Sequence, residues 1–279
     1  MKRTGGWINF FRFAIVAGLA LAACQPAAPQ AAATESTLDK ILAAGVMRAC
    51  IAPEFPPDMY LDEQGNPAGF SVALTNAMAE SLGVTVEWVQ SDFAGIIAGV
   101  GADKCDIAPG TVAPRAKRAL VGSFAKVILL SVVGLVVDAD DARATIDEFN
   151  QSDVTFAVLE GTLSEAVYNR DFSNAAVTKF SDVNAGFLEV LSGRADAYPM
   201  DDVTGLAYTQ QQPDLKLILT GQGGLGVSPT APLVPLGDDK FIRWIDTFVD
   251  EFINNGDYAV MFEREMGYKA DIPTLMAWR

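Results

Sequence analysis

The sequence predicts an α/β protein with two lobes, and three observations support this prediction. Short runs of Val, Ile and Leu alternate with segments in which apolar residues recur every three or four positions, as strands and helices do when they alternate. Glycines follow several of the helical segments at the position where helices commonly end. After its N-terminal region the chain keeps about 240 residues, which is more than a single hydrophobic core commonly holds.

The first half of the chain is predicted to begin with a helix that Ser36 or Thr37 caps and Gly45 ends. A turn around Gly65–Asn66 predicts a hairpin or a loop. Strands that alternate with helices favour a mostly parallel sheet with helices on both faces. The other elements expected here are strands at 46–52, 84–89 and 105–110 and helices at 71–83 and 92–104.

The second half opens with an apolar run at 127–137 that is rich in β-branched side chains. We expect a core strand there, because a run this short cannot span a bilayer as a helix. Residues 238–267 are expected to be helical, with an apolar stripe that packs on the core. The remaining expected elements are strands at 154–161, 195–200 and 216–221 and helices at 163–172, at 183–193 and after Asp202.

The N-terminus has the parts of a secretory signal peptide. Three basic residues accompany an apolar run at 13–23, which is shorter than the ~20 residues of a membrane-spanning helix. The segment "LAAC", residues 21–24, resembles the bacterial lipobox, in which the cysteine receives a lipid. We therefore expect removal of residues 1–23 and lipidation of Cys24. An uncut membrane anchor is the alternative.

A linker is expected at residues 24–36, because this stretch is rich in Ala, Pro and Gln and has no large apolar side chain. Without residues 1–23 the chain would hold 17 basic and 35 acidic side chains, a net charge of −18. A chain this acidic is not expected to bind nucleic acid, or to bind an anionic membrane through its own protein surface.

Histidine is absent from the sequence, which excludes a histidine-based catalytic triad and an imidazole metal site. Two cysteines remain besides Cys24. Cys50 and Cys105 could form a disulfide in an oxidising compartment, or both could be buried free thiols. The sequence leaves these two possibilities open.

Several stretches together resemble one family, the periplasmic amino-acid-binding proteins, which are the family 3 solute-binding proteins of ABC importers. The resemblance rests on residues 45–110 and on "RALVGSF", "VLEGTLSEAVY" and "GRADAYPMDD", and it covers nearly the whole chain after the signal peptide. It implies a periplasmic binding protein type II fold, in which two hinge strands join two α/β lobes and the ligand lies in the cleft between them. By this resemblance lobe 1 comprises residues 37–130 and 228–279, lobe 2 comprises residues 131–227, and the hinge strands lie at 128–132 and 224–229.

The carboxylate of an amino acid needs a cation, and arginine suits it because its planar fork donates two parallel hydrogen bonds. The family places this arginine six residues before a phenylalanine, and Arg118 lies six residues before Phe124. Arg115 is the rival, because "GTVAPR" also resembles the family's turn before its arginine. Alternatively, both arginines form a solvated basic patch with Lys117.

The resemblance also places Gly110, Thr111 and Ala113 beside the ligand. The family usually has a Ser or Thr five residues before its arginine, where this chain has Ala113. Thr111 could contribute a hydroxyl or a backbone group instead. One hydrogen bond to the carboxylate, and the assumption of an ordinary amino acid as ligand, are therefore left open.

Lobe 2 is expected to contribute one helix start and one acid. By the resemblance, Thr162 and the backbone of Leu163 would hold the carboxylate at a helix N-terminus. The alternative is an ordinary helix cap by Thr162 or Ser164. Asp201 would pair with the ligand's ammonium group, unless Asp201 and Asp202 only cap the helix that follows.

Two aromatic rings, Phe55 and Phe93, fall where the family flanks the ligand side chain, although core burial would also explain them. The family often has an aspartate three residues before the first ring, where this chain has Ala52. Leu159 stands where some members have a lysine. A cleft without these charges favours a less polar ligand side chain.

Together these features predict a binding lipoprotein on the periplasmic side of the cell envelope, anchored by Cys24, that passes an amino acid or small organic acid to an ABC permease. We expect a monomer with no catalytic residue, no metal and no cofactor, and not an enzyme. Two alternatives use the same fold. One is a sensory or dehydrogenase-accessory binding protein, and the other is an enzyme similar to cyclohexadienyl dehydratase.

Overall fold

The computed structural model describes residues 35–219 and 224–279 of the chain. The expected signal peptide, Cys24 and most of the linker lie outside these residues. From Ser36 onward the chain forms one unit. Within the described part, no helix is both long and apolar enough to cross a membrane.

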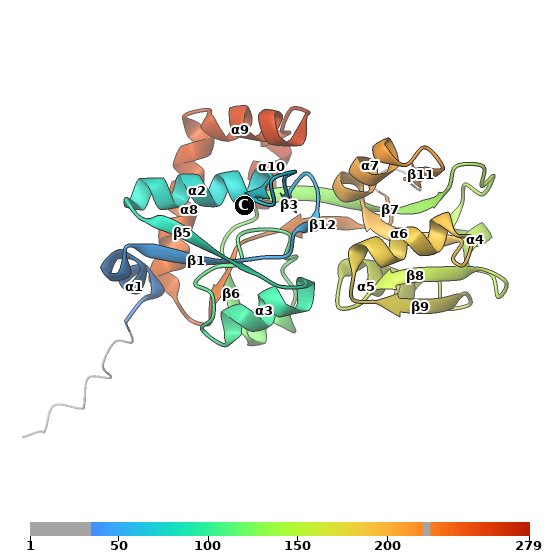
Figure 1. Cartoon of the computed structure of the whole chain (residues 1–279), viewed down its shortest axis with the longest axis horizontal. Coiled ribbons are helices and arrows are strands. Elements are labelled where there is room, and N and C mark those ends of the chain that lie inside the picture. The colour runs from blue at the N-terminus through green and yellow to red at the C-terminus, as the bar shows by residue number, and fades with distance from the viewer. Residues whose placement is uncertain (1–34, 220–223) are drawn as a thin grey trace, which may run out of the picture. The chain divides into compact units, whose positions relative to one another are not determined.

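Two groups of elements make up this unit, and we call them lobe 1 and lobe 2 (Figure 1). Lobe 1 contains both ends of the described chain, and its elements are α1 (Thr37–Ala44), β1 (Val46–Ile51), β2 (Glu54–Phe55), β3 (Met59–Leu61), β4 (Pro67–Ala68), α2 (Phe70–Leu82), β5 (Thr85–Gln90), α3 (Phe93–Gly101), η1 (Arg118–Leu120), β6 (Gly122–Phe124), β13 (Leu233–Pro235), α8 (Asp239–Asn254), α9 (Asp257–Met266) and α10 (Ile272–Trp278). The middle of the chain forms lobe 2, with α4 (Ile146–Phe149), β8 (Thr155–Leu159), α5 (Leu163–Asp171), β9 (Ala176–Phe180), α6 (Val183–Leu191), β10 (Ala197–Asp201), α7 (Asp202–Gln211) and β11 (Leu215–Ile218).

Two further strands, β7 (Leu129–Asp138) and β12 (Val227–Thr230), connect the lobes (Figure 1). They are antiparallel neighbours, with Leu129 opposite Thr230 and Val132 opposite Val227. The later part of β7 pairs with β10 and β11 inside lobe 2. The ladder between β7 and β12 therefore ties the two lobes together through backbone hydrogen bonds.

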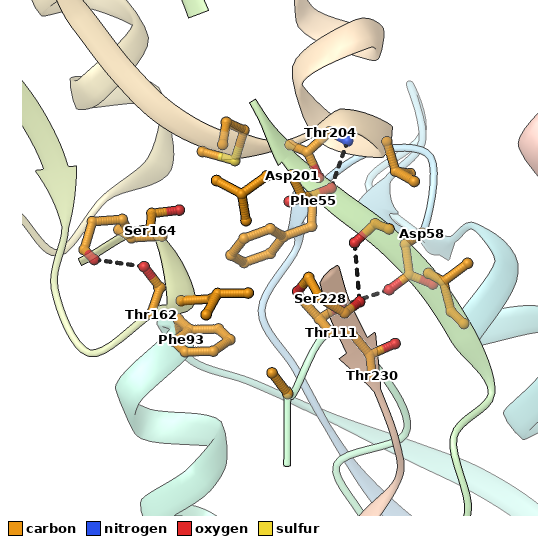
Figure 2. Close-up of a pocket in the computed structure, with 18 of the residues that line it drawn as sticks. Phe55, Asp58, Phe93, Thr111, Thr162, Ser164, Asp201, Thr204, Ser228 and Thr230 are labelled. Atoms are coloured by element: carbon orange, nitrogen blue, oxygen red, sulfur yellow. Dashed lines mark hydrogen bonds between the residues drawn. The ribbon is translucent and has the colours of Figure 1, made fainter. Parts of the chain in front are cut away.

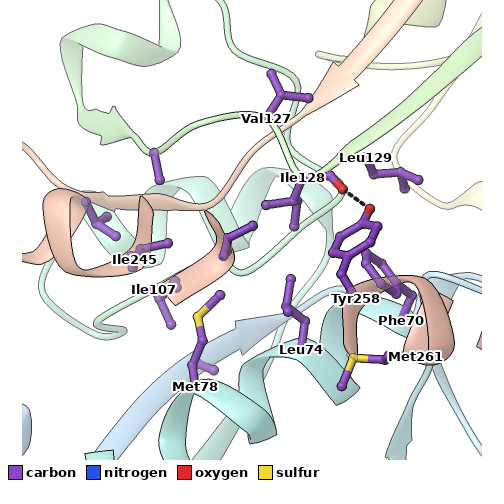
Figure 3. Packing of buried hydrophobic residues seen from close by; sticks show 14 of the residues in the cluster. Phe70, Leu74, Met78, Ile107, Val127, Ile128, Leu129, Ile245, Tyr258 and Met261 are labelled. Atoms are coloured by element: carbon purple, nitrogen blue, oxygen red, sulfur yellow. Dashed lines mark hydrogen bonds between the residues drawn. The ribbon is translucent and has the colours of Figure 1, made fainter. Parts of the chain in front are cut away.

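The core of lobe 1 lies between helices α2, α8 and α9 and the strands (Figure 3). The ring of Phe70 on α2 meets Tyr258 and Phe262 of α9 edge-on, at centroid distances of 5.3 and 5.2 Å. The buried Tyr258 hydroxyl donates a hydrogen bond to the backbone carbonyl of Ile128, just before β7. Each ring of this size contributes roughly 1.5–3 kcal/mol by leaving water. This packing fixes the start of the connecting strand on the lobe 1 core.

The sheet of lobe 2 has the strand order β11-β7-β10-β8-β9. Strands β10, β8 and β9 are parallel, whereas β7 is antiparallel to β10, β11 and β12. The mostly parallel sheet predicted for the first half of the chain is confirmed for β1 and β5 of lobe 1, which pair in parallel. In lobe 2, by contrast, β7 departs from the parallel direction. The reason is that β7 enters from lobe 1 directly, and parallel pairing follows only where a helix returns the chain to the same end of the sheet.

Several local predictions are confirmed. Ser36 caps α1 by accepting a hydrogen bond from the backbone N–H of Leu38. Gly45 and Gly83 end α1 and α2 with φ of 71° and 70°, a conformation that costs a glycine little. The turn at residues 65–66 lies between β3 and β4, in a small sheet with the order β2-β3-β4.

Other local predictions are wrong or incomplete. Residues 105–110 form no strand and make only two isolated bridges, at Ile107 and Ala108. Pro109 follows directly and has no backbone N–H to continue a ladder. The helical tail predicted at residues 238–267 is present as α8 and α9, with a break at Gly256, whose φ is positive. Helix α10 lies beyond the predicted tail and was not expected. Strand β9 was not expected, because most of its side chains are exposed and its sequence has no apolar run.

Cys50 and Cys105 form a disulfide that joins β1 to the segment after α3. Both cysteines are buried, and they pack with Ile96 and Val100 of α3. The question that the sequence left open is thus answered in favour of the bridge within lobe 1.

Candidate functional site

A cavity of ≈ 60 Å³ lies between the two lobes, at the strands that connect them (Figure 2). Because one buried water needs about 10–15 Å³ measured in this way, the space would hold roughly four to six water-sized groups. Both lobes and both connecting strands contribute to its lining. From lobe 1 these are Phe55, Asp58, Phe93, Thr111, Ala113 and Arg118, from lobe 2 Leu159, Thr162, Leu163, Ser164, Met200, Asp201, Val203 and Thr204, and from β7 and β12 Leu129, Ser131, Val133, Ser228 and Thr230.

The structure brings most of the sequence-predicted site residues to this cavity. Gly110 and Arg115 are the exceptions, since neither lines it. The roles of the residues that do line it, as contacts of a ligand, remain predictions. The predicted residues at the cavity wall are Phe55, Phe93, Thr111, Ala113, Arg118, Thr162, Leu163 and Asp201.

Arg118 is the only arginine at this cavity within the described residues, and its side chain is 7% exposed. One guanidinium nitrogen donates to the carbonyl of Ala113 at 2.7 Å, and another donates across the cleft to the carbonyl of Gly161 at 2.6 Å. Its guanidinium carbon lies 5.1 Å from the centre of the Phe93 ring. Burial, and next the nearby Arg115, lower the pKa of Arg118 to about 10.

No carboxylate of the described chain lies within 4 Å of the Arg118 guanidinium, which sets it apart from the paired arginines of the surface. A buried cation held only by carbonyl oxygens pays a desolvation penalty that a bound anion would offset. The arrangement can therefore accept one small carboxylate at this end of the cavity.

Arg115 lies beside Arg118 in the chain but outside the cavity lining, and it is half-buried. Its Nη2 atom is buried and has no hydrogen-bond partner in the described part of the chain. Burial lowers the pKa of Arg115, and the attraction of Glu165 in lobe 2 opposes this shift. Its position fits the rim of the cleft better than the carboxylate site.

Thr162 occupies the N-cap position of α5, but its hydroxyl does not cap the helix. It donates instead to the carbonyl of Leu159 at 2.7 Å. The alternative that Thr162 is an ordinary helix cap is therefore not supported by its side chain, which makes no cap hydrogen bond. Leu163 and Ser164, the first residues of α5, line the cavity beside it.

Asp201 combines both roles that the sequence left open. It caps α7 by accepting from the backbone N–H of Thr204 at 2.9 Å, and it also lines the cavity (Figure 2). Burial raises the pKa of Asp201 from 3.8 to about 6, and the negative charges of Asp202 and Asp58 add to this effect. An ionised Asp201 would therefore gain from a nearby cation.

Asp58 is a cavity residue that the sequence analysis missed. Its side chain is 3% exposed and accepts hydrogen bonds from the hydroxyls of Ser71 at 2.6 Å and Thr111 at 2.7 Å. Burial raises its pKa, although both hydroxyl bonds act in the opposite direction. The one signal for it was an acidic residue inside the otherwise apolar segment "FPPDM".

Gly110 and Thr111 hold the wall beside Asp58. Thr111 has a φ of +64°, an uncommon conformation for a β-branched residue that costs roughly 1–3 kcal/mol. A Cβ atom at Gly110 would lie 1.9 Å from the Ser71 hydroxyl, so only glycine fits there. Gly110 does not line the cavity itself. It packs closely against Ser71 and so supports the neighbouring residue Thr111, which does line the cavity.

Phe55 and Phe93 lie on the cavity wall with ring centres 5.7 Å apart, and both are also buried in the core. Their apolar cluster includes Leu159 from lobe 2, so the two lobes already touch through apolar side chains. Within the described residues no group of three or more His, Cys, Asp or Glu side chains could hold a metal ion.

The fold is that of a two-lobed protein with two connecting strands and a cavity between its lobes. The model of the bacterial extracellular solute-binding proteins, family 3, matches residues 47–268, and the chain belongs to this family.

Among curated proteins the chain is similar to the cyclohexadienyl dehydratase of Pseudomonas aeruginosa, with 27% identity over 93% of this chain and 96% of that protein. It is also similar to the lysine/arginine/ornithine-binding periplasmic protein of Escherichia coli, with 25% identity over 57% of this chain and 62% of that protein. A solved structure of an ancestral amino-acid-binding protein, described as a precursor of cyclohexadienyl dehydratase, matches with a TM-score of 0.76 and 26% identity, over 83% of this chain and all of that one.

The expectation that this protein is not an enzyme is contradicted by one of these relatives. Cyclohexadienyl dehydratase is an enzyme by name, and its similarity to this chain extends over nearly the full length of both proteins. Sequence reasoning failed here because it found no catalytic group separate from the binding residues. A carboxylate that binds a ligand can also transfer a proton.

Proposed function

We propose that this protein is an extracytoplasmic solute-binding protein that captures an amino acid or a similar small carboxylate between its lobes and delivers it to an ABC permease. The observation that carries this proposal is Arg118, a buried cation at the cavity with carbonyl partners only. The family and its amino-acid-binding relatives support it.

Capture would work by closure of the lobes about β7 and β12. The proposed parts are residues 37–130 and 228–279 for lobe 1 and residues 131–227 for lobe 2. A ligand that contacts both lobes stabilises the closed state by the difference in its affinity for the closed and open forms. Arg118 on lobe 1 and Asp201 on lobe 2 give a zwitterion one contact on each side.

The location proposed for this protein is the periplasmic side of a bacterial envelope, with a lipid on Cys24 and residues 24–36 as the tether. The support comes from the N-terminal sequence, which lies outside the described residues, and from the extracellular character of the family. Metabolic labelling with a radioactive or clickable fatty acid tests this. Wild type should be labelled, and a Cys24→Ala variant should not.

A thermal-shift screen of the protein from Ser36 to Arg279 against the twenty L-amino acids and a set of small organic acids tests the binding function. A ligand at 100 times its Kd should add about 2.7 kcal/mol to the unfolding free energy. A screen in which no amino acid and no carboxylic acid shifts the melting temperature would contradict the proposal. For a ligand that does shift the melting temperature, an isothermal titration should give one binding site per chain.

The second candidate function is an elimination reaction on a cyclohexadienyl carboxylate. Two observations favour it: the extended similarity to cyclohexadienyl dehydratase, and Asp201 with a pKa of about 6 at the cavity wall. A protonated carboxyl group could give its proton to a departing hydroxyl as water. The electron pair of the bond to the leaving carbon dioxide would complete the aromatic ring, and solvent would return the proton to Asp201.

An assay with prephenate and arogenate separates the two functions. An aromatic product that accumulates beyond one equivalent per protein would establish turnover. Loss of that product in Asp201→Asn, with Arg115→Ala as a matched control outside the cavity, would assign the proton donor. A ligand that binds and is recovered unchanged supports the binding function.

A further inference from the structure

The cavity contains two carboxylates, and the proposed function uses only Asp201. Asp58, from the loop between β2 and β3 in lobe 1, also lines the cavity and is almost completely buried. None of the ion pairs of the described residues includes Asp58. A carboxylate buried in this way is costly unless hydrogen bonds or a cation compensate it.

Asp58 is held in place by a network that leaves room for a further partner. Ser71 donates to one carboxylate oxygen and Thr111 donates to the other. Each ionised oxygen can accept more than one hydrogen bond, so both can still accept from a ligand. Thr111 reaches Asp58 from a positive-φ backbone, and Gly110 permits the close approach of Ser71.

The charges of the cavity are separated along its length. Arg118 lies over the Phe93 ring and contacts Gly161, next to Thr162. In Figure 2, Phe93 and Thr162 lie on one side of the Phe55 ring and Asp58 lies on the other. The negative charge of Asp58 acts on Asp201, so the two acids are close enough to influence each other.

One arginine and two carboxylates give the cavity a net charge of −1 when all three groups are ionised. Around the two acids the neighbouring titratable groups are Asp202, Tyr258 and Tyr268, and none of them is a cation. Arg115 is a further cation beside Arg118, but it lies outside the cavity lining. Like charges in one site disfavour ionisation of both acids, and a cation between them removes that penalty. Lysine and arginine side chains of the described chain do not supply such a cation here.

We propose that Asp58 is a specificity-determining residue that binds the cationic amine of the ligand together with Asp201, so that the cavity takes amino acids and rejects the same acids without an amine. This inference rests on the proposed function. It assigns the acid end of the cavity to two residues, one from each lobe. It also names the substrate class as compounds with a carboxylate and at least one ammonium group.

Matched pairs of ligands test this inference in isothermal titrations. The probes are L-alanine with propanoate, which fits the described volume, and the larger pairs L-valine with 3-methylbutanoate, L-phenylalanine with 3-phenylpropanoate, and L-arginine with 5-guanidinopentanoate. For the pairs that bind, wild type should bind the amino acid about 100-fold more tightly than the acid without the amine. Asp58→Asn should reduce this ratio at least tenfold, with no loss of affinity for the acid.

Two control variants separate charge from structure. Ser71→Ala removes one hydrogen bond to Asp58 and keeps the carboxylate, so the ratio should change less than threefold. Asp106→Asn removes another buried acid of lobe 1, one that pairs with Arg48 at 2.6 Å outside the cavity, and the ratio should stay unchanged. If Asp58→Asn does not fold, Asp58→Ser gives the same comparison.

Three outcomes would overturn the inference. An unchanged ratio in the Asp58 variants would show that the amine does not use this residue. An equal loss of affinity for both members of a pair would show that Asp58 only holds the segment 110–111 in place and does not bind the amine. Failure of every amino acid in the thermal-shift screen of wild type would refute the proposed amino-acid function itself, and the present inference with it.

Discussion

The two lobes contribute different kinds of groups to the cavity. Lobe 1 supplies charged side chains and rings on a stiff base, where the Cys50–Cys105 disulfide and the Asp58–Thr111 hydrogen bond fix the backbone. Lobe 2 supplies mainly the starts of α5 and α7, with Asp201 as its one acid at the cavity within the described residues. We infer from this difference that lobe 1 carries the larger share of ligand selection, with Asp201 as the contribution of lobe 2, and that closure brings lobe 2 over the ligand.

Direct contacts between the lobes support this division. Arg118 of lobe 1 donates to the Gly161 carbonyl, and Glu54 of lobe 1 accepts from the backbone N–H of Val183 at the start of α6. In both contacts lobe 1 provides a side chain and lobe 2 provides its backbone. The predictions below test whether lobe 1 carries selectivity and lobe 2 carries closure.

The largest effect is expected for Arg118→Ala. Without the guanidinium, the ligand carboxylate would be buried without a cation, which costs about 4 kcal/mol, or roughly 1,000-fold in Kd. Isothermal titration with the best amino acid from the thermal-shift screen measures this loss. If this variant bound the ligand with wild-type affinity, the proposal that lobe 1 holds the ligand carboxylate through Arg118 would be contradicted.

Arg115→Ala is the matched control, because Arg115 has the same charge and lies three residues earlier. Its position outside the cavity lining predicts a change in Kd of less than tenfold. If Arg115→Ala abolished binding and Arg118→Ala did not, the carboxylate would be held at the rim of the cleft. That result would reverse the choice between the two arginines.

These two arginines also show what the sequence could predict. Arg118, Asp201 and the two rings were found because each lies in a short motif at a fixed spacing. Asp58 was not found, because its partners Ser71 and Thr111 are 13 and 53 residues away along the chain. Contacts of this kind depend on how α2 packs against the loop at 110–111, and one sequence gives no direct signal of that packing.

The same limit applies to the fold. Caps and glycines marked the ends of α1 and α2, because those signals are local. The antiparallel direction of β7 was missed, because its hydrophobic pattern is the same for parallel and antiparallel neighbours. The disulfide stayed undecided at first since pairing requires two distant segments, β1 and the chain after α3, to meet.

The second largest effect is expected for the double variant Cys50→Ala/Cys105→Ala. The bridge spans 55 residues of sequence, and its loss should lower the unfolding free energy by about 3–4 kcal/mol. Urea unfolding measures the total loss, and hydrogen exchange locates it. Protection should decrease in β1 and α3 of lobe 1 and remain in β8 and β10 of lobe 2. Equal loss in both lobes would contradict a separate stiff base in lobe 1.

A smaller effect is expected for Asp201→Asn without ligand. Because folding raises the pKa of Asp201 from 3.8 to about 6, ionised Asp201 destabilises the folded state above pH 6, and this penalty disappears as the pH falls toward 4. The asparagine variant keeps a good helix cap and should be more stable than wild type at pH 8, by about 1–2 kcal/mol, and equal to it at pH 4. Melting temperatures across this range test the sign.

Asp271→Asn is the control for that measurement, because Asp271 also caps a helix, α10, on the exposed surface. Hydrogen bonds from Thr274 lower the pKa of Asp271, so its contribution to stability is present at neutral pH and is lost in strong acid. The variant should therefore be less stable than wild type at pH 8. Variants of Asp201 and Asp271 that shift in the same direction would contradict the assigned burial of Asp201.

The smallest effect is expected at the contact between Glu54 and α6. Burial raises the pKa of Glu54, and the negative charges of Asp182 and Asp92 add to this shift, whereas the hydrogen bond from the Val183 N–H opposes it. Separation of the lobes would remove part of the burial and the charge of Asp182, so we expect an open form to hold the proton less tightly. Protonation therefore favours closure.

Glu54→Gln resembles the protonated side chain and can still accept from the Val183 N–H, so at pH 8 this variant should bind ligand two- to threefold more tightly than wild type. Glu87→Gln, on β5 away from the cleft, should leave the affinity unchanged. Because Glu54 lies outside the cavity lining, the gain in affinity should be the same for every ligand that closes the lobes. A gain that differs between ligands would place part of the selectivity at the lobe interface. That result would contradict the assignment of selectivity mainly to the cavity side chains of lobe 1.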